Sequence, residues 1–141
     1  MFIFTLLLAL TLGNPIRNGL PNSNLYPSVS IEKLSKKDGW VRPRALIVGK
    51  VTYVNHEADG DWHIKVTNLA GSFVVCEIIP ELPINNFIVP TKRNMPNIGD
   101  TITIWGIVRW DGEHKWSELH PVIGWTLISK MKHKRKLIEP K

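Results

Sequence analysis

The stretch HEADGDWHI, residues 56–64, gathers side chains that transfer protons or hold metal ions. It places two imidazoles and three carboxylates within eight residues, namely His56, Glu57, Asp59, Asp61 and His63. The stretch WDGEHKWSELH, residues 110–120, has a similar make-up, with an Asp-Gly step, acidic residues, tryptophans and two histidines. Carboxylates and imidazoles suit Zn or Mn, and they also serve as general acids and bases. What these stretches do depends on whether the fold brings them together.

Each stretch contains an acid-X-His step at the entrance of a predicted strand. Side chains alternate along a strand, so the acid and the histidine of each step point the same way. We therefore expect one polar rim cluster made of Asp61, His63, Glu118 and His120. Three interpretations are open: local braces of tight turns, groups that hydrogen-bond a polar ligand, or a metal or acid–base site. The candidate metal ligands are the same four residues. The sequence has no HExxH motif and no nucleophile elbow, and we assign no catalytic residue.

Five segments show strand patterns, and turn signals separate them. They read ALIVGKVTYV, WHIKVTNL, FVVCEII, TITIWGIVRW and WSELHPVIGWTLI, the last interrupted by Pro121 and Gly124. Gly49, inside the first segment, predicts a bulge or a sharp bend. Prolines forbid a long helix across residues 80–98, and SIEKLSKKDGW predicts one or two helical turns that end near Gly39. The sequence therefore predicts an all-β domain.

This pattern resembles the OB fold, a five-stranded Greek-key barrel. The resemblance rests on ALIVGKVTYV, GDWHIKVTNLAGSFVVCEI and NIGDTITIWGIV, and it covers roughly residues 44–126. It departs between strands three and four, where many OB domains have a helix and this chain has prolines. The pair ADGDWHI and SELHPV also resembles a little-characterised group of small prokaryotic OB-like proteins. The resemblance implies a ligand face flanked by the first–second and fourth–fifth loops, and it implies no activity.

Several residues are candidates for binding a single-stranded nucleic acid or another oligomeric ligand. The fourth strand is expected to turn Trp105 and Arg109 outward as a stacking ring with a cationic neighbour, although Trp105 could instead pack under the N-terminal arm. Trp110 and Trp116 flank the fourth turn and either clasp it as a pair or stack on a ligand. Lys65 adds a positive charge. The predicted ligand-binding set is therefore Lys65, Trp105, Arg109, Trp110 and Trp116.

The net charge of +6 is unevenly distributed along the chain. Residues 1–44 carry +4, residues 45–129 carry −3 and residues 130–141 carry +5. Phosphate binding needs clustered Lys and Arg, so the central segment alone argues against nucleic acid. The basic tail KMKHKRKLIEPK could supply the missing charge, could be solvated without a partner, or could contact anionic lipid.

The predicted organisation has four parts. Residues 1–13 form an apolar leader, 14–43 a linker or arm with a short helix, 44–129 the barrel and 130–141 the basic tail. The leader is too short for a comfortable transmembrane helix and fits a signal peptide or anchor, which predicts a secreted or membrane-associated protein. If the leader belongs to the fold, or if translation starts elsewhere, a cytoplasmic location is expected. The single cysteine, Cys76, excludes an internal disulfide and is expected to be buried and inert.

These observations favour a non-enzymatic OB-fold binding module for single-stranded nucleic acid, single-stranded DNA included, or for another oligomeric ligand. Two alternatives remain. The first is a metal-binding or metal-dependent hydrolytic site on the Asp61/His63 and Glu118/His120 rim. The second is an envelope-associated domain that contacts other proteins. No cofactor is expected, apart from a divalent metal under the first alternative.

Overall fold

The computed structural model describes residues 20–79 and 95–129. The predicted leader (1–13), the basic tail (130–141) and most of the proline-rich link between strands three and four lie outside the described residues.

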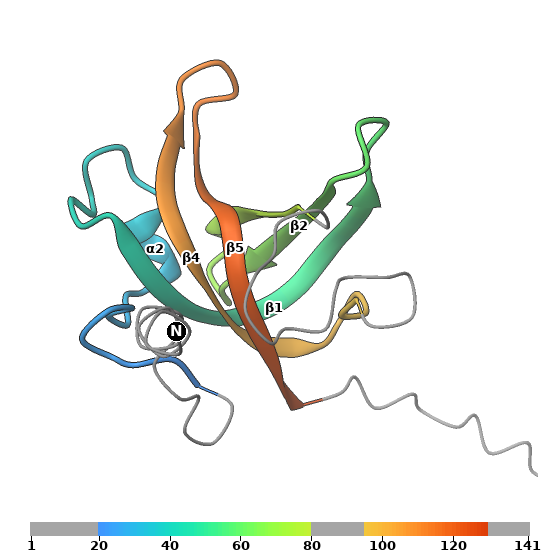
Figure 1. The fold of residues 1–141 in the computed structure, drawn as a ribbon, viewed down its shortest axis with the longest axis horizontal. Helices are drawn as coiled ribbons and strands as arrows, with labels where there is room; N and C mark the ends of the chain where they lie inside the picture. The colour runs from blue at the N-terminus through green and yellow to red at the C-terminus, as the bar shows by residue number, and fades with distance from the viewer. Residues whose placement is uncertain (1–19, 80–94, 130–141) are drawn as a thin grey trace, which may run out of the picture.

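The described residues form one closed five-stranded barrel (Figure 1). Its strands are β1 (Arg44–His56), β2 (Trp62–Thr67), β3 (Phe73–Ile78), β4 (Thr101–Asp111) and β5 (Trp116–Ser129). They follow the order β1-β2-β3-β5-β4, and β4 closes the barrel by pairing with β1. The pairs are antiparallel except β3–β5, which is parallel. The predicted all-β, five-stranded barrel is therefore confirmed.

Strand β1 belongs to two parts of the wall. Its first half, Arg44–Lys50, pairs with β4, and its second half, from Lys50 to His56, pairs with β2. Gly49 lies where one partner gives way to the other. A Cβ at Gly49 would lie 2.5 Å from the Cδ1 of Ile31 and 2.8 Å from the Cγ1 of Val66. A glycine is needed here because neighbouring side chains approach the backbone, and the register shift itself falls between Val51 and Tyr53.

The barrel interior is filled by aliphatic side chains from every strand. The largest fully buried aliphatic residues are Leu34, Ile47, Ile64, Ile102, Ile104 and Leu119. The thiol of Cys76 is free and fully buried, as expected. Burial raises the pKa of this thiol, with a smaller contribution from the nearby charge of Glu118. Cys76 is therefore an inert core residue.

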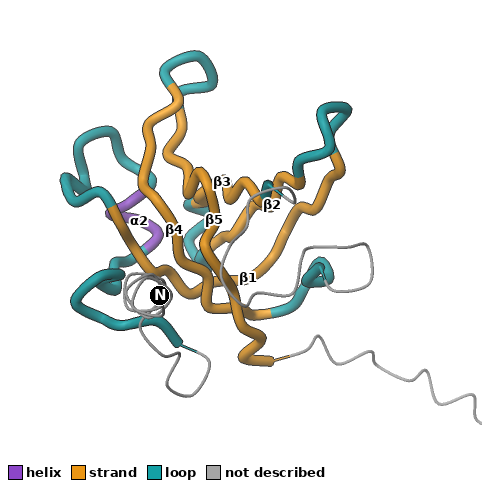
Figure 2. Tube along the Cα trace, in the orientation of Figure 1, coloured by secondary structure: helices purple, strands orange, loops and turns teal. Residues whose placement is uncertain are grey.

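One helical turn is present as α2 (Ile31–Leu34), and it ends at Leu34, earlier than the predicted end near Gly39 (Figure 2). The Oγ of Ser30 accepts a hydrogen bond from the Lys33 N–H and caps the helix. Ile31 and Leu34 are 3% and 1% exposed and join the barrel core, so α2 closes part of the hydrophobic interior. No helix among residues 20–79 and 95–129 is long and apolar enough to cross a membrane.

Candidate functional site

The candidate site lies on the outer face of the wall formed by β1, β2, β3 and β5. Tyr53 of β1 lies opposite Lys65 of β2, Lys65 lies opposite Val75 of β3, and Val75 lies opposite Glu118 of β5. Because side chains alternate along a strand, residues two positions away share this face: His63, Phe73, Glu77, Trp116 and His120. The turns that follow β1 and β4 project at one end of the barrel, with β2 and β3 between them (Figures 1 and 2).

Glu77 joins the two histidines. Its Oε1 lies 3.2 Å from the Nε2 of His63, and its Oε2 lies 2.5 Å from the Nδ1 of His120. The Oε2 of Glu118 lies 3.4 Å from the same Nδ1 atom of His120. Glu77 and Glu118 are 9% and 6% exposed, so two carboxylates are largely removed from water here. We call His63, Glu77, Glu118 and His120 the polar cluster.

Neighbouring side chains hold the polar cluster in place. The indole N–H of Trp116 donates to the Oε1 of Glu118 over 2.8 Å. On the other side, the Nδ1 of His63 lies 3.5 Å from the Oε1 of Glu57. That carboxylate oxygen also accepts a hydrogen bond of 2.8 Å from the Asn55 side chain. The polar cluster therefore rests on fixed partners at both ends.

The sequence predicted most of this cluster. His63, Glu118 and His120 come together as expected from the acid-X-His alternation. The fourth expected member, Asp61, lies in the turn, where its N–H donates to Asp59 and its carbonyl accepts from Glu57. Among residues 20–79 and 95–129, the carboxylates within ion-pair distance of His63 are those of Glu57 and Glu77.

Sequence reasoning missed Glu77, although a signal was present. Glu77 is the one charged residue in the apolar run FVVCEII. A carboxylate at a buried strand position must be hydrogen-bonded or paired. Its partners could have been sought on the neighbouring strands, because Glu77 lies opposite His63 in the register of β2 and β3.

Beside the polar cluster, three aromatic rings surround the ammonium group of Lys65. Its Nζ lies 4.8 Å from the ring centroid of Phe73, 5.4 Å from that of Trp116 and 5.5 Å from that of Tyr53. Phe73 and Trp116 also contact each other edge to face, with centroids 6.2 Å apart. We call Tyr53, Lys65, Phe73 and Trp116 the Lys65 aromatic group. Of these, Lys65 and Trp116 were predicted, and the register of β1, β2 and β3 was needed to find the other two.

The turn between β4 and β5 is built around Asp111. Its Oδ1 accepts hydrogen bonds from the backbone N–H groups of Glu113 and His114, and its Oδ2 lies 2.6 Å from the Nδ1 of His114. The side-chain hydrogen bond from His114 is the main reason that the pKa of Asp111 falls to about 2. The same bond raises the pKa of His114. The His114 ring stacks on Trp116 with centroids 4.6 Å apart, so this turn is coupled to the Lys65 aromatic group.

The turn between β1 and β2 uses the same kinds of contact. Asp59 accepts the N–H of Asp61, Gly60 adopts a positive φ of 99°, and His56 stacks on Trp62 with centroids 4.5 Å apart. The acidic residues of HEADGDWHI therefore have separate tasks. Asp59 shapes the turn, whereas Glu57 orients His63.

One predicted ligand residue is corrected. Trp105 lies opposite Leu46 and Gly124 and is 1% exposed, so the rest of the chain covers it and it offers no stacking surface. The alternation along β4 holds, because Ile102 and Ile104 belong to the barrel core cluster and Trp105 does not, but Trp105 is covered in the folded chain.

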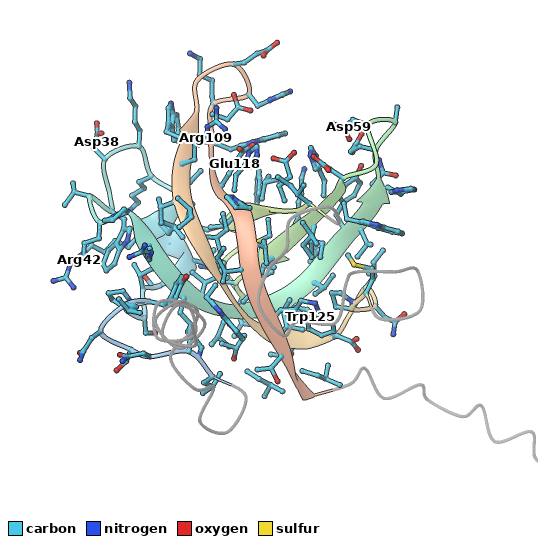
Figure 3. All side chains as sticks on the ribbon, viewed as in Figure 1. Asp38, Arg42, Asp59, Arg109, Glu118 and Trp125 are labelled. Carbon is cyan, nitrogen blue, oxygen red and sulfur yellow. The ribbon has the colours of Figure 1, made fainter. Side chains whose placement is uncertain are left out.

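Of the two alternatives for Trp110 and Trp116, the cross-strand pair is not formed. Trp110 lies opposite Ser117, and Trp116 lies opposite Asp111, so the two indoles point to different sides of the hairpin. Arg109 lies opposite Glu118 and is exposed (Figure 3), which leaves it on the face of the candidate site.

Comparisons with known structures agree with the topology. An OBody, AM1L10, bound to hen egg-white lysozyme superposes with a TM-score of 0.50 and 15% identity, covering 62% of this chain and 80% of that one. The S. pombe Stn1-ten1 complex gives a TM-score of 0.51 and 14% identity, covering 65% of this chain and 62% of that one. No known protein-family profile and no curated protein sequence matches the chain. At this identity the likeness concerns the fold, and together with the barrel topology it defines the chain as an OB-fold protein.

Proposed function

We propose that this protein is a non-enzymatic module that binds single-stranded nucleic acid on the outer face of β1, β2, β3 and β5. The observation that carries the proposal is the Lys65 aromatic group, a cation surrounded by three rings on that face. OB folds bind oligonucleotides and oligosaccharides on the face of strands two and three, between the first–second and fourth–fifth loops. The Lys65 aromatic group occupies that position.

The residue types match what an unpaired strand requires. Bases stack on aromatic rings, and each such contact contributes about 1–3 kcal/mol, with little dependence on sequence. Tyr53 is 40% exposed, and Phe73 and Trp116 are half-buried, so each retains some accessible surface. Lys65 and Arg109 provide positive charge for phosphates on the same face.

The charge distribution limits the proposed mode of binding. Residues 45–129 carry a net charge of −3, and the polar cluster adds carboxylates close to the rings. A duplex, which presents two dense rows of phosphates, fits this surface poorly. A short single strand that stacks its bases on the rings and turns its phosphates toward Lys65 and Arg109 fits better.

The test is a titration of the full chain with short fluorescently labelled single-stranded oligonucleotides at low salt. We expect Phe73→Ala to weaken binding by about 1–3 kcal/mol, because it removes one stacking ring. Lys65→Gln should also weaken binding and should reduce its dependence on salt. The matched control is Arg42→Ala, which removes a cation beside the ring of Trp40, 5.7 Å from its centroid. Figure 3 shows Arg42 on the other side of the molecule from Asp59, which lies in the turn between β1 and β2.

The proposal fails if the parent protein does not bind at low salt. It also fails if folded Phe73→Ala and Lys65→Gln bind as well as Arg42→Ala does. Capture of a protein partner through the same rings, without oligonucleotide binding, would favour the alternative of a protein-interaction domain.

A further inference from the structure

We propose that Glu77, Glu118 and His120 bind a first-row divalent cation of the Zn²⁺ or Mn²⁺ kind. One ligand atom from each of these residues lies within 4.8 Å of the others. The three residues come from two strands, since Glu77 lies on β3 and the other two lie on β5. The three proposed ligands are not stacking rings, although Trp116 of the Lys65 aromatic group also holds Glu118.

The two carboxylates are oriented in the same way. The Oε2 of Glu77 and the Oε2 of Glu118 both face the Nδ1 of His120, at 2.5 Å and 3.4 Å. Their other oxygens are held elsewhere, because the Oε1 of Glu77 contacts His63 and the Oε1 of Glu118 accepts the indole N–H of Trp116. Each carboxylate thus has one anchored oxygen and one oxygen directed at a shared point.

This arrangement matches the two shells of a metal site. The groups that ligate a metal are normally held by further hydrogen bonds that fix their orientation. Loss of these hydrogen-bond partners lowers the affinity for the metal. Trp116 supplies such a partner for Glu118. For Glu77 the partner is His63, which is itself held by Glu57, and Asn55 holds Glu57 in turn. We therefore assign His63 and Trp116 as positioning residues, with no direct contact to the ion.

Charge and donor chemistry select the kind of ligand. Glu77 and Glu118 are nearly buried and close together, and their ion-pair contacts within the described part of the chain come from imidazoles. A divalent cation would offset two adjacent carboxylates in this environment. One imidazole nitrogen with two carboxylate oxygens suits Zn²⁺ or Mn²⁺, whereas Mg²⁺ prefers an all-oxygen, largely hydrated site. Ligands at about 2.0–2.2 Å from Zn²⁺ would be reached by small side-chain rotations.

The experiment is calorimetric titration of the full chain, stripped with chelator, with ZnCl₂ and separately with MnCl₂. We expect one saturable site for at least one of the two ions, and at least tenfold weaker binding in Glu77→Gln and in Glu118→Gln. Trp116→Phe keeps an aromatic ring but removes the N–H that holds Glu118, and it should lower the affinity for the metal about 10–100-fold. The matched control is His56→Asn, which removes an exposed imidazole that contacts Trp62 and Gly60 outside the site and should leave the affinity unchanged.

Absence of saturable binding of either ion would overturn the proposal. So would binding that the folded Gln variants retain. If the Gln variants do not fold, Mn²⁺ added to the parent protein decides the question by paramagnetic broadening of NMR signals. Broadening centred on His120, Glu118 and Glu77 supports the site, and broadening centred on His114 or His56 contradicts it. If the parent protein binds neither ion but still binds oligonucleotide, this site alone is refuted and the proposed function stands.

Discussion

At the scale of single residues, the chemistry of the site depends on carboxylates that orient imidazoles. Glu77 contacts both His63 and His120, Glu57 contacts His63 from behind, and Asp111 pairs with His114 in the neighbouring turn. Trp116 of the Lys65 aromatic group connects the turn to the polar cluster. The His114 ring stacks on Trp116, and the indole N–H of Trp116 donates to Glu118. The acidic character of the two stretches therefore follows from local contacts, while the basic surplus lies toward the ends of the chain.

The pair of Asp111 and His114 makes a direct prediction about pH. Because the raised pKa of His114 depends first on its hydrogen bond to Asp111, Asp111→Asn should lower the pKa of His114 toward its ordinary value of about 6.5. The contribution of His114 to stability is present below that ordinary pKa and is lost as pH rises through its raised value. The contribution of Asp111 is present above about pH 4 and is lost as pH falls toward about 2.

NMR titration of the His114 ring in the parent and in Asp111→Asn measures this prediction. A histidine of the polar cluster, His63, serves as the internal reference because it does not contact Asp111. An unchanged His114 pKa in the variant would contradict the structure of the turn.

At the scale of elements, β1 determines the shape of the barrel. It pairs with β4 along its first half and with β2 along its second half, and in doing so it carries Tyr53 to the outer face, opposite Lys65. The change of partner falls beside Gly49, where Ile31 of α2 and Val66 of β2 both approach the backbone. The position of Tyr53 in the candidate site thus depends on tight packing at Gly49.

Replacing Gly49 by Ala should destabilise the fold by about 1–3 kcal/mol, because the new methyl group would overlap Ile31 and Val66. Gly112→Ala is the matched control, since a Cβ there meets nothing within 4 Å. The control should remain within about 0.5 kcal/mol of the parent. Chemical denaturation of both variants measures the difference, and equal stability of the two would show that the barrel is not closely packed at Gly49.

The elements show how far the sequence could predict the site. Alternation within a strand correctly grouped Glu118 with His120, because that period is local. The same rule placed Trp105 on the side away from the core residues Ile102 and Ile104, but it could not show that Trp105 would be covered, because that depends on the rest of the fold. Glu77, Phe73 and Tyr53 could not be assigned to the site until the pairing of β1, β2 and β3 was known.

At the scale of the whole molecule, the net positive charge and the proposed binding surface lie in different parts of the chain. The chain carries +6, but residues 45–129 carry −3 and the last twelve residues carry +5. Long-range attraction to a polyanion would come from the ends of the chain, whereas the rings on the barrel would make the short-range contacts.

The salt dependence of oligonucleotide binding separates these contributions. For single strands the slope of log K against log salt is about −0.7 per neutralised phosphate, so Lys65 and Arg109 alone would give about −1.4. We expect a steeper slope for the parent protein. The slope should fall toward about −1.4 when the six Lys and Arg residues of positions 130–141 are replaced by Gln. Identical slopes for the two proteins would exclude the tail from binding.

The central claim, that the outer face of β1, β2, β3 and β5 binds single-stranded nucleic acid, is tested most directly by NMR. A short unlabelled oligonucleotide is titrated at low salt into the isotope-labelled full chain, and the shifted signals are assigned. We predict shifts concentrated at Tyr53, Lys65, Phe73 and Trp116, with Trp40 and Arg42 unchanged. Shifts centred on Trp40 and Arg42, or no shifts at saturating oligonucleotide, would contradict it.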